Sequence, residues 1–153
     1  MTDAELYALG RRLLDEHGLH DWDFLIGNAR NQFGVCVYGM KRIRISRVLA
    51  ALNPGMVEDT ILHEIAHALA GHAAGHGPEW RAVARSLGCN AERFHQGMVP
   101  EPAWRGTCRN CGTVVARRNR LSKSTQNTAC GRCCREHNDG LWDVRFTLEW
   151  VRA

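Results

Sequence analysis

The chain has 153 residues, which is enough for one compact catalytic domain plus a small module but not for two full-sized domains. Its hydrophobic fraction of 44% and net charge of +4 are those of an ordinary globular protein, and no apolar run approaches the roughly 20 residues needed to cross a bilayer. The first 30 residues lack a basic segment followed by an apolar stretch, so we predict no secretory signal, no membrane contact and a cytoplasmic location.

The N-terminal segment predicts a helix over residues 3–17, because its leucines recur at helical spacing. Thr2 or Asp3 is suited to the N-cap, and Gly18 follows the last turn.

A β-hairpin is predicted next. Residues 33–38 are rich in β-forming side chains, and residues 42–46 alternate strictly between polar and apolar types. Gly39 lies between the two segments. The alternation predicts that Ile43 and Ile45 face the core.

A long helix is predicted from Asn53, which is suited to the N-cap, and Pro54, which suits the first helical position. Gly71 is suited to end it. Apolar residues recur every four positions and predict the face that packs on the core. These residues are Val57, Ile61, Ile65 and Leu69.

Two further elements complete the prediction. A helix is expected from Pro78 to Leu87, closed by Gly88. Residues 141–150 alternate in a pattern typical of a strand.

The long helix carries His63-Glu-Ile-Ala-His67, an H-E-x-x-H motif. Residues four apart on a helix point the same way, so His63 and His67 can converge on one metal ion. Zinc accepts such nitrogen ligands and, in catalytic sites, keeps a position for water. Glu64 is poorly placed to join the ligands but can take a proton from that water, so we predict it as the catalytic general base.

A catalytic zinc site needs a third protein ligand, and several residues are candidates. His72 and His76 lie in the glycine-rich turn of residues 71–77, which can bring the chain back to the metal. His76 directly precedes the next predicted helix, which would fix its position, whereas His72 follows the motif too closely for relaxed geometry. Glu92 and His95 remain candidates from the segment beyond that helix.

The run from Asp59 to Trp80 resembles the SprT-like metallopeptidase family, which is related to the Spartan proteases. In that family the H-E-x-x-H helix is followed by a His-Gly-x-x-Trp/Phe setting, which matches His76, Gly77 and Trp80. The resemblance covers roughly residues 30–134. It implies an α+β, zincin-like metalloprotease fold and a catalytic zinc held by three histidines. These are His63, His67 and His76.

Four cysteines form two C-x-x-C pairs separated by eighteen residues, a spacing typical of a structural zinc ribbon. They are Cys108, Cys111, Cys130 and Cys133. Cys134 could replace Cys133, but the two-residue gap favours Cys133. We therefore predict a small β-rich module stabilised by a second zinc ion.

The positive charge is concentrated in this module. Residues 1–101 carry 10 basic and 12 acidic side chains, whereas residues 102–153 carry 10 basic and 4 acidic ones. The change coincides with Pro100 and Pro102, so we predict a protease domain over 1–101 and the ribbon over 102–153.

Between residues 102 and 135 the chain has eight basic side chains and no acidic one, which favours contact with nucleic acid. A basic face that is merely solvated is the alternative. Trp104 and Trp142 only flank the basic run, so base stacking is not indicated. The best-placed contacts are Arg117, Arg118, Arg120 and Lys123.

The leading hypothesis is a monomeric zinc-dependent metalloendopeptidase with one catalytic and one structural zinc. The resemblance implies proteins bound or crosslinked to DNA as substrates, and hence a location at DNA or the nucleoid. The alternative is a nucleic-acid-binding zinc protein whose H-E-x-x-H site performs no proteolysis, which the intact Glu64 disfavours. A deformylase-like hydrolase would need an upstream cysteine ligand, and the setting of Cys36 does not resemble one.

Amide hydrolysis also needs a hydrogen-bond donor for the oxyanion that develops on the carbonyl oxygen. Tyr38, His72 and Arg47 are candidates that the sequence does not rank.

Overall fold

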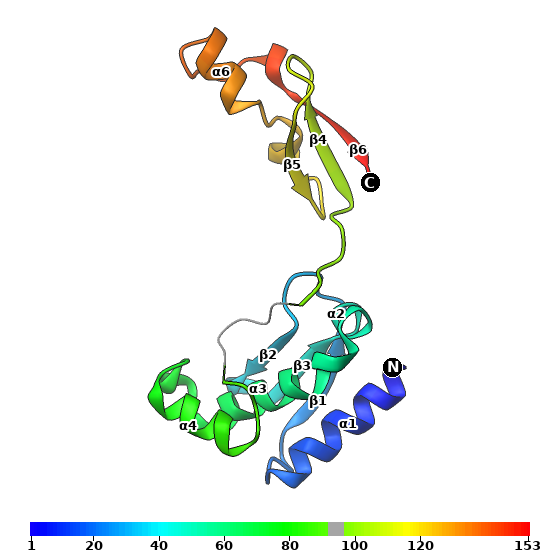
Figure 1. Ribbon diagram of the computed structural model, residues 1–153, viewed down its shortest axis with the longest axis vertical. Coiled ribbons are helices and arrows are strands. Elements are labelled where there is room, and N and C mark those ends of the chain that lie inside the picture. Colours follow the sequence, from blue (N-terminus) through cyan, green and yellow to red (C-terminus); the bar gives the residue numbers. More distant parts are fainter. Residues whose placement is uncertain (92–96) are drawn as a thin grey trace. The chain divides into compact units, whose positions relative to one another are not determined.

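The computed structural model describes residues 1–91 and 97–153 (Figure 1). They form two compact units, Met1–Pro100 and Glu101–Ala153. Each unit combines helices with a three-stranded sheet, so the chain is α+β. Two of the other candidates for the third ligand, Glu92 and His95, lie outside the described residues. No helix of the described part is long and apolar enough to span a bilayer.

The sheet of the first unit has the order β1-β3-β2, with β3 (Arg42–Ser46) in the centre. The predicted hairpin is confirmed, since β2 (Gly34–Val37) pairs with β3 in antiparallel register. Ile43 and Ile45 of β3 are fully buried, also as predicted. The parallel strand β1 (Asp23–Gly27) was not predicted, because five residues with one buried side chain give little alternation.

The N-terminal helix α1 (Asp3–Glu16) confirms its prediction. Thr2 is the N-cap of a full capping box, in which the Thr2 N–H donates to the Glu5 carboxylate and the Glu5 N–H donates to the Thr2 hydroxyl. Gly10 lets the helix approach the sheet, since a Cβ there would lie 2.3 Å from the Phe24 ring.

The start of the long helix differs from the prediction. A separate helix α2 (Arg47–Leu52), capped by Ser46, comes first, and a 3-10 turn over Pro54–Met56 follows. Helix α3 then runs over Val57–Ala70. Asn53 is therefore not its N-cap, because the Asn53 amide instead bonds to the backbone of Leu49 and Met98.

The predicted core face of α3 is correct for three of its four residues. Val57, Ile61 and Ile65 are buried, but Leu69 is 44% exposed. Positions four apart on an α-helix drift by about 40° at each step, so the fourth member has rotated out of the core.

Two short elements complete the first unit. After Gly71 a 3-10 turn covers His72–Ala74, and helix α4 (Pro78–Ser86) follows. The prediction of α4 is confirmed, and its residue Trp80 is fully buried.

The second unit has the sheet order β5-β4-β6, formed by β4 (Trp104–Cys108), β5 (Val114–Arg118) and β6 (Leu148–Arg152). Its helices are α5 (Lys123–Gln126) and α6 (Gly131–His137).

The strand predicted over 141–150 is wrong in its first part. Asp143 caps a 3-10 turn over Val144–Phe146 by accepting from the Arg145 N–H, and the extended strand begins only at Leu148. A local side-chain bond to the backbone thus overrides the alternating pattern.

Candidate metal centre

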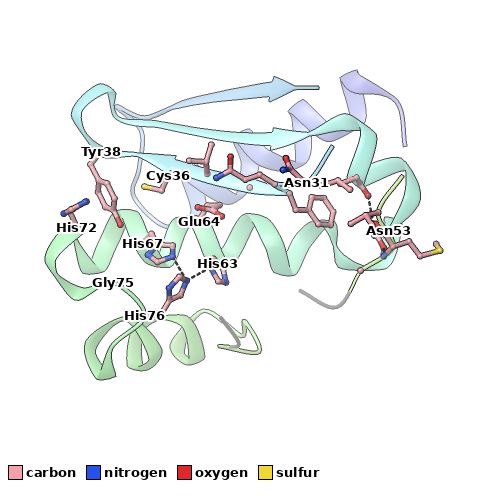
Figure 2. A pocket seen from close by; sticks show the side chains of 18 residues that line it. Asn31, Cys36, Tyr38, Asn53, His63, Glu64, His67, His72, Gly75 and His76 are labelled. Carbon is pink, nitrogen blue, oxygen red and sulfur yellow. Dashed lines mark hydrogen bonds between the residues drawn. The ribbon is translucent and has the colours of Figure 1, made fainter. Parts of the chain in front are cut away.

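Helix α3 packs against β2 and β3 and against α4, so its middle turns are enclosed. His63 and Glu64 are buried there, and His67 is half-buried one turn later. The helical spacing places both imidazoles on the side that faces α4 and the preceding turn (Figure 2).

His76 completes this group. The chain reverses after α3 through Gly71 and Gly75, which both have positive φ (84° and 50°) that other residues rarely adopt. This reversal brings the His76 Nε2 atom to 3.1 Å from that of His63 and 3.0 Å from that of His67. All three ligand atoms lie within 4.8 Å of one another.

The spacing of these nitrogens fits a divalent metal. A tetrahedral zinc ion with bonds of about 2.0–2.1 Å would hold its nitrogen ligands about 3.3 Å apart. The two Nε2–Nε2 distances of 3.0 and 3.1 Å are close to this value. The His76 Nε2 atom carries at most one proton, so hydrogen bonds alone do not satisfy all three nitrogens. Burial lowers the pKa of His67 to about 4, with a further contribution from His76, which favours the neutral form that ligates metals.

Trp80 supports all three histidine rings from behind. Its indole lies 4.7 Å from the His63 ring, 5.1 Å from His67 and 4.6 Å from His76 between centroids. The buried indole therefore restricts the rotation of all three histidine rings.

The carboxylate of Glu64 lies between α3 and β2. It is 7% exposed, and burial raises its pKa to about 7, while a hydrogen bond from the Cys36 backbone N–H acts in the opposite direction. Gly34 of β2 makes room for it, because a Cβ on Gly34 would lie 2.6 Å from the nearer carboxylate oxygen.

Gly34→Ala should therefore displace Glu64. We expect the metal content to be unchanged and any hydrolytic activity of this site to fall by about tenfold or more, since proton transfer depends on hydrogen-bond distance. Gly39→Ala is the matched control in the same hairpin, because a Cβ there meets nothing within 4 Å. Equal activities of the two variants in a cleavage assay would show that the close contact is unimportant.

A cleft of about 550 Å³ opens over this group. In Figure 2 Tyr38 and His72 lie at the end near His67, and Asn53 lies at the other end. Phe33, Leu49 and the segment 97–99 also line the cleft.

Asn53 secures the far wall of this cleft. Its amide nitrogen donates to the Met98 carbonyl (2.9 Å), and its amide oxygen accepts from the Met98 N–H (2.6 Å). Gly97 passes so close that a Cβ would lie 2.8 Å from the same amide oxygen. Asn53 thus joins a distant segment to the helical scaffold.

Comparison with known proteins is consistent with this geometry. The family model described as "SprT-like family" matches residues 9–99, which is more than half of the chain. The chain belongs to the SprT-like family. The protein named Protein SprT from Vibrio parahaemolyticus serotype O3:K6 (strain RIMD 2210633) is 28% identical to it over 105 residues. That match covers 61% of this chain and 64% of the relative, so the chain spans less than two thirds of the relative's length.

The SprT-like chain has a second candidate metal group in its C-terminal unit. The sulfur atoms of Cys108, Cys111, Cys130 and Cys133 lie within 4.8 Å of one another. The Cys108–Cys133 separation is 3.8 Å, close to the sulfur–sulfur distance of about 3.8 Å expected for tetrahedral zinc with 2.3 Å bonds. Cys134 is buried with Phe146 and Leu148 and is not a member of the group.

The basic residues predicted to contact nucleic acid lie on β5 and in the segment that follows it. Arg117 and Arg118 are exposed on β5, and Arg120 and Lys123 are exposed directly after it. Arg105 was not singled out from the sequence, yet it lies directly opposite Arg117 across the β4–β5 pair. Within the described residues no acidic side chain forms an ion pair with any of these five.

Trp142 also lies beside this surface. Its exposed indole donates to the Asn127 carbonyl (2.8 Å), immediately after α5. Trp142 lies beyond the basic run in the sequence, but the chain folds back over 15 residues and brings its indole to the end of α5.

Proposed function

We propose that this SprT-like protein is a zinc-dependent metalloendopeptidase. The observation that carries the proposal is the convergence of three imidazole Nε2 atoms, 3.0 and 3.1 Å apart, beside a buried carboxylate on the floor of a cleft. His63, His67 and His76 would hold the ion, and Glu64 would be the general base. This arrangement is also what a zincin-like fold requires of its central helix.

A zinc ion at the three histidines would supply Lewis acidity to activate water and polarise a carbonyl group. Glu64 takes a proton from the attacking water and later delivers it to the leaving nitrogen. Its raised pKa supports this double role, since a group that titrates near neutrality both accepts and releases a proton readily. Gly34 leaves room for the Glu64 carboxylate, and Trp80 restricts the rotation of the histidine rings.

The shape of the cleft supports a polypeptide substrate. β2 is an edge strand, and its Cys36 N–H points away from β3 toward Glu64. Because successive residues of an antiparallel strand alternate, the backbone groups of Gly34 also face the cleft. An extended peptide can pair with this edge, with its side chains in the cleft.

The second unit would direct the enzyme to nucleic acid. Opposed arginines such as Arg105 and Arg117 repel each other across a sheet, and a bound phosphate would relieve that repulsion. The exposed indole of Trp142 beside the basic turn adds a surface on which a base can stack. We accordingly propose DNA-associated or DNA-crosslinked proteins as the substrate class, with the structural zinc held by the four cysteines.

The test is cleavage of a DNA-binding protein by the full zinc-loaded chain, with and without single-stranded DNA, before and after chelation. We expect two zinc ions per chain by mass spectrometry and a cleavage that DNA stimulates and chelation abolishes. Two zinc ions and tight DNA binding without cleavage under any condition would instead favour a nucleic-acid-binding protein with a non-proteolytic metal site.

The nucleic-acid surface has its own prediction. Arg105→Gln combined with Arg117→Gln should weaken binding to an oligodeoxythymidylate and lower the slope of log K against log salt by about 1.4, because each phosphate contact contributes about 0.7 for single strands. Arg12→Gln is the control, since Arg12 is exposed on α1 and paired with Glu16. An unchanged slope, measured by fluorescence anisotropy, would show that these arginines do not contact phosphates.

A further inference from the structure

Tyr38 stands on the wall of the cleft at its His67 end. It follows the last residue of β2, and in Figure 2 its hydroxyl is turned toward helix α3. The ring is partly buried, yet its hydroxyl makes no hydrogen bond to any residue that the structure describes. A phenol that lines a cleft with its donor unused is available to a bound molecule.

The ring of Tyr38 is held in place by His72. The two rings meet edge to face, with centroids 5.1 Å apart and planes at 85°. His72 begins the 3-10 turn directly after α3, so the same chain reversal that delivers His76 also supplies this support. His72 is not part of the group formed by the other three histidines.

Arg47, the remaining candidate oxyanion donor, has a different place. Its guanidinium pairs with Asp3 at 2.5 Å, and it is not among the residues that line the cleft. The structure thus separates three residues that the sequence left equal.

We propose that the Tyr38 hydroxyl donates a hydrogen bond to the oxyanion formed during peptide-bond hydrolysis, with His72 as the positioning residue for the Tyr38 ring. This inference rests on the proposed peptidase function and adds a catalytic residue to it.

The reaction sequence defines what Tyr38 contributes. The water oxygen bonds to the carbonyl carbon while its proton passes to Glu64, and the π electron pair of the carbonyl moves onto its oxygen. When the C–N bond breaks, that pair re-forms the C=O bond and the proton on Glu64 passes to the leaving nitrogen. Tyr38 keeps its own proton throughout and stabilises the negative charge only while it exists, which raises kcat rather than substrate affinity.

The surroundings of Tyr38 keep it in the donor form. Burial raises the pKa of the phenol, and the neighbouring Cys36 and Glu64 act in the same direction. The hydroxyl therefore remains protonated at neutral pH and is able to donate.

The experiment compares Tyr38→Phe with Tyr7→Phe in the full zinc-loaded chain, using β-casein and then a peptide that spans a mapped cleavage site. These two are the tyrosines of the chain, and Tyr7 lies on α1 with an exposed side chain. We expect Tyr38→Phe to lower kcat by about 10²-fold with KM within about threefold, because one oxyanion donor is lost. Tyr7→Phe should behave as wild type, and His72→Phe should retain more activity than His72→Ala because it keeps a ring against Tyr38.

A second readout does not depend on turnover. A phosphinic analogue of the same peptide carries a tetrahedral anion, so its Kd by calorimetry should rise about as much in Tyr38→Phe as kcat falls. With 3-fluorotyrosine labelling the chain gives two 19F signals, and only the signal retained in Tyr7→Phe should shift when the analogue binds.

The outcomes are separable. Wild-type cleavage with an unimpaired Tyr38→Phe, or a rise in KM with kcat unchanged, would overturn the role of Tyr38 alone. If the zinc-loaded wild type cleaves none of the probes, the proposed function fails and this inference fails with it.

Discussion

Glu64→Gln is expected to lower the rate of peptide-bond cleavage by about 10²–10⁴-fold, the contribution typical of a general base. Glutamine has nearly the same shape and can still accept the hydrogen bond from the Cys36 N–H, so the helix and the three histidines should keep their places. It cannot take a proton from water at neutral pH. The measurement is cleavage of the probe protein, with zinc content determined on the same sample.

The control for this prediction is Glu58→Gln, on the exposed side of the same helix. It should leave both cleavage and zinc content unchanged. If Glu64→Gln cleaved the probe at the wild-type rate, Glu64 would not be the base. If the variant lost both cleavage and zinc, the loss of activity would say nothing about proton transfer.

Cys133→Ser is expected to remove the structural zinc and unfold the C-terminal unit. A structural zinc site contributes an apparent 10–16 kcal/mol of binding free energy at neutral pH, and the small apolar cluster of this unit cannot replace it. Zinc content should fall from two ions to one per chain. In a 15N-NMR spectrum the signals of Glu101–Ala153 should collapse, while those of Met1–Pro100 remain dispersed.

Cys134→Ser is the matched variant at the adjacent position. Cys134 is also buried but lies outside the four-sulfur group, so both zinc ions should be retained. Placing a hydroxyl among apolar side chains should lower the free energy of unfolding by about 1–2 kcal/mol. The reverse result, with zinc lost from Cys134→Ser and kept by Cys133→Ser, would assign the fourth ligand to Cys134.

The sequence by itself determined those features of the protein that depend on local spacing. The helical period alone places His63 and His67 on one side of α3, and the predicted helix is confirmed around them. The pattern of the hairpin strands predicted the buried faces of Ile43 and Ile45. The family resemblance followed from a continuous run of residues within one helix and one turn, and the family model confirms it.

Only the tertiary structure decided the features that depend on how distant segments meet. The positive φ angles of Gly71 and Gly75 turn His76 toward the other histidines and His72 toward Tyr38, and no periodicity encodes such a turn. Local preference was misleading at Asn53, where a bond across 45 residues to Met98 outweighs the capping tendency.

The C-terminal unit shows the same division. The C-x-x-C spacing predicts the group of four cysteines. The pairing of Arg105 with Arg117 depends on strand register, and the position of Trp142 depends on a loop that folds back. Spacing along a chain fixes which side chains share a face, because the backbone repeat is regular. Contacts between segments are fixed by packing and by the free energy of the whole fold, which no single segment contains.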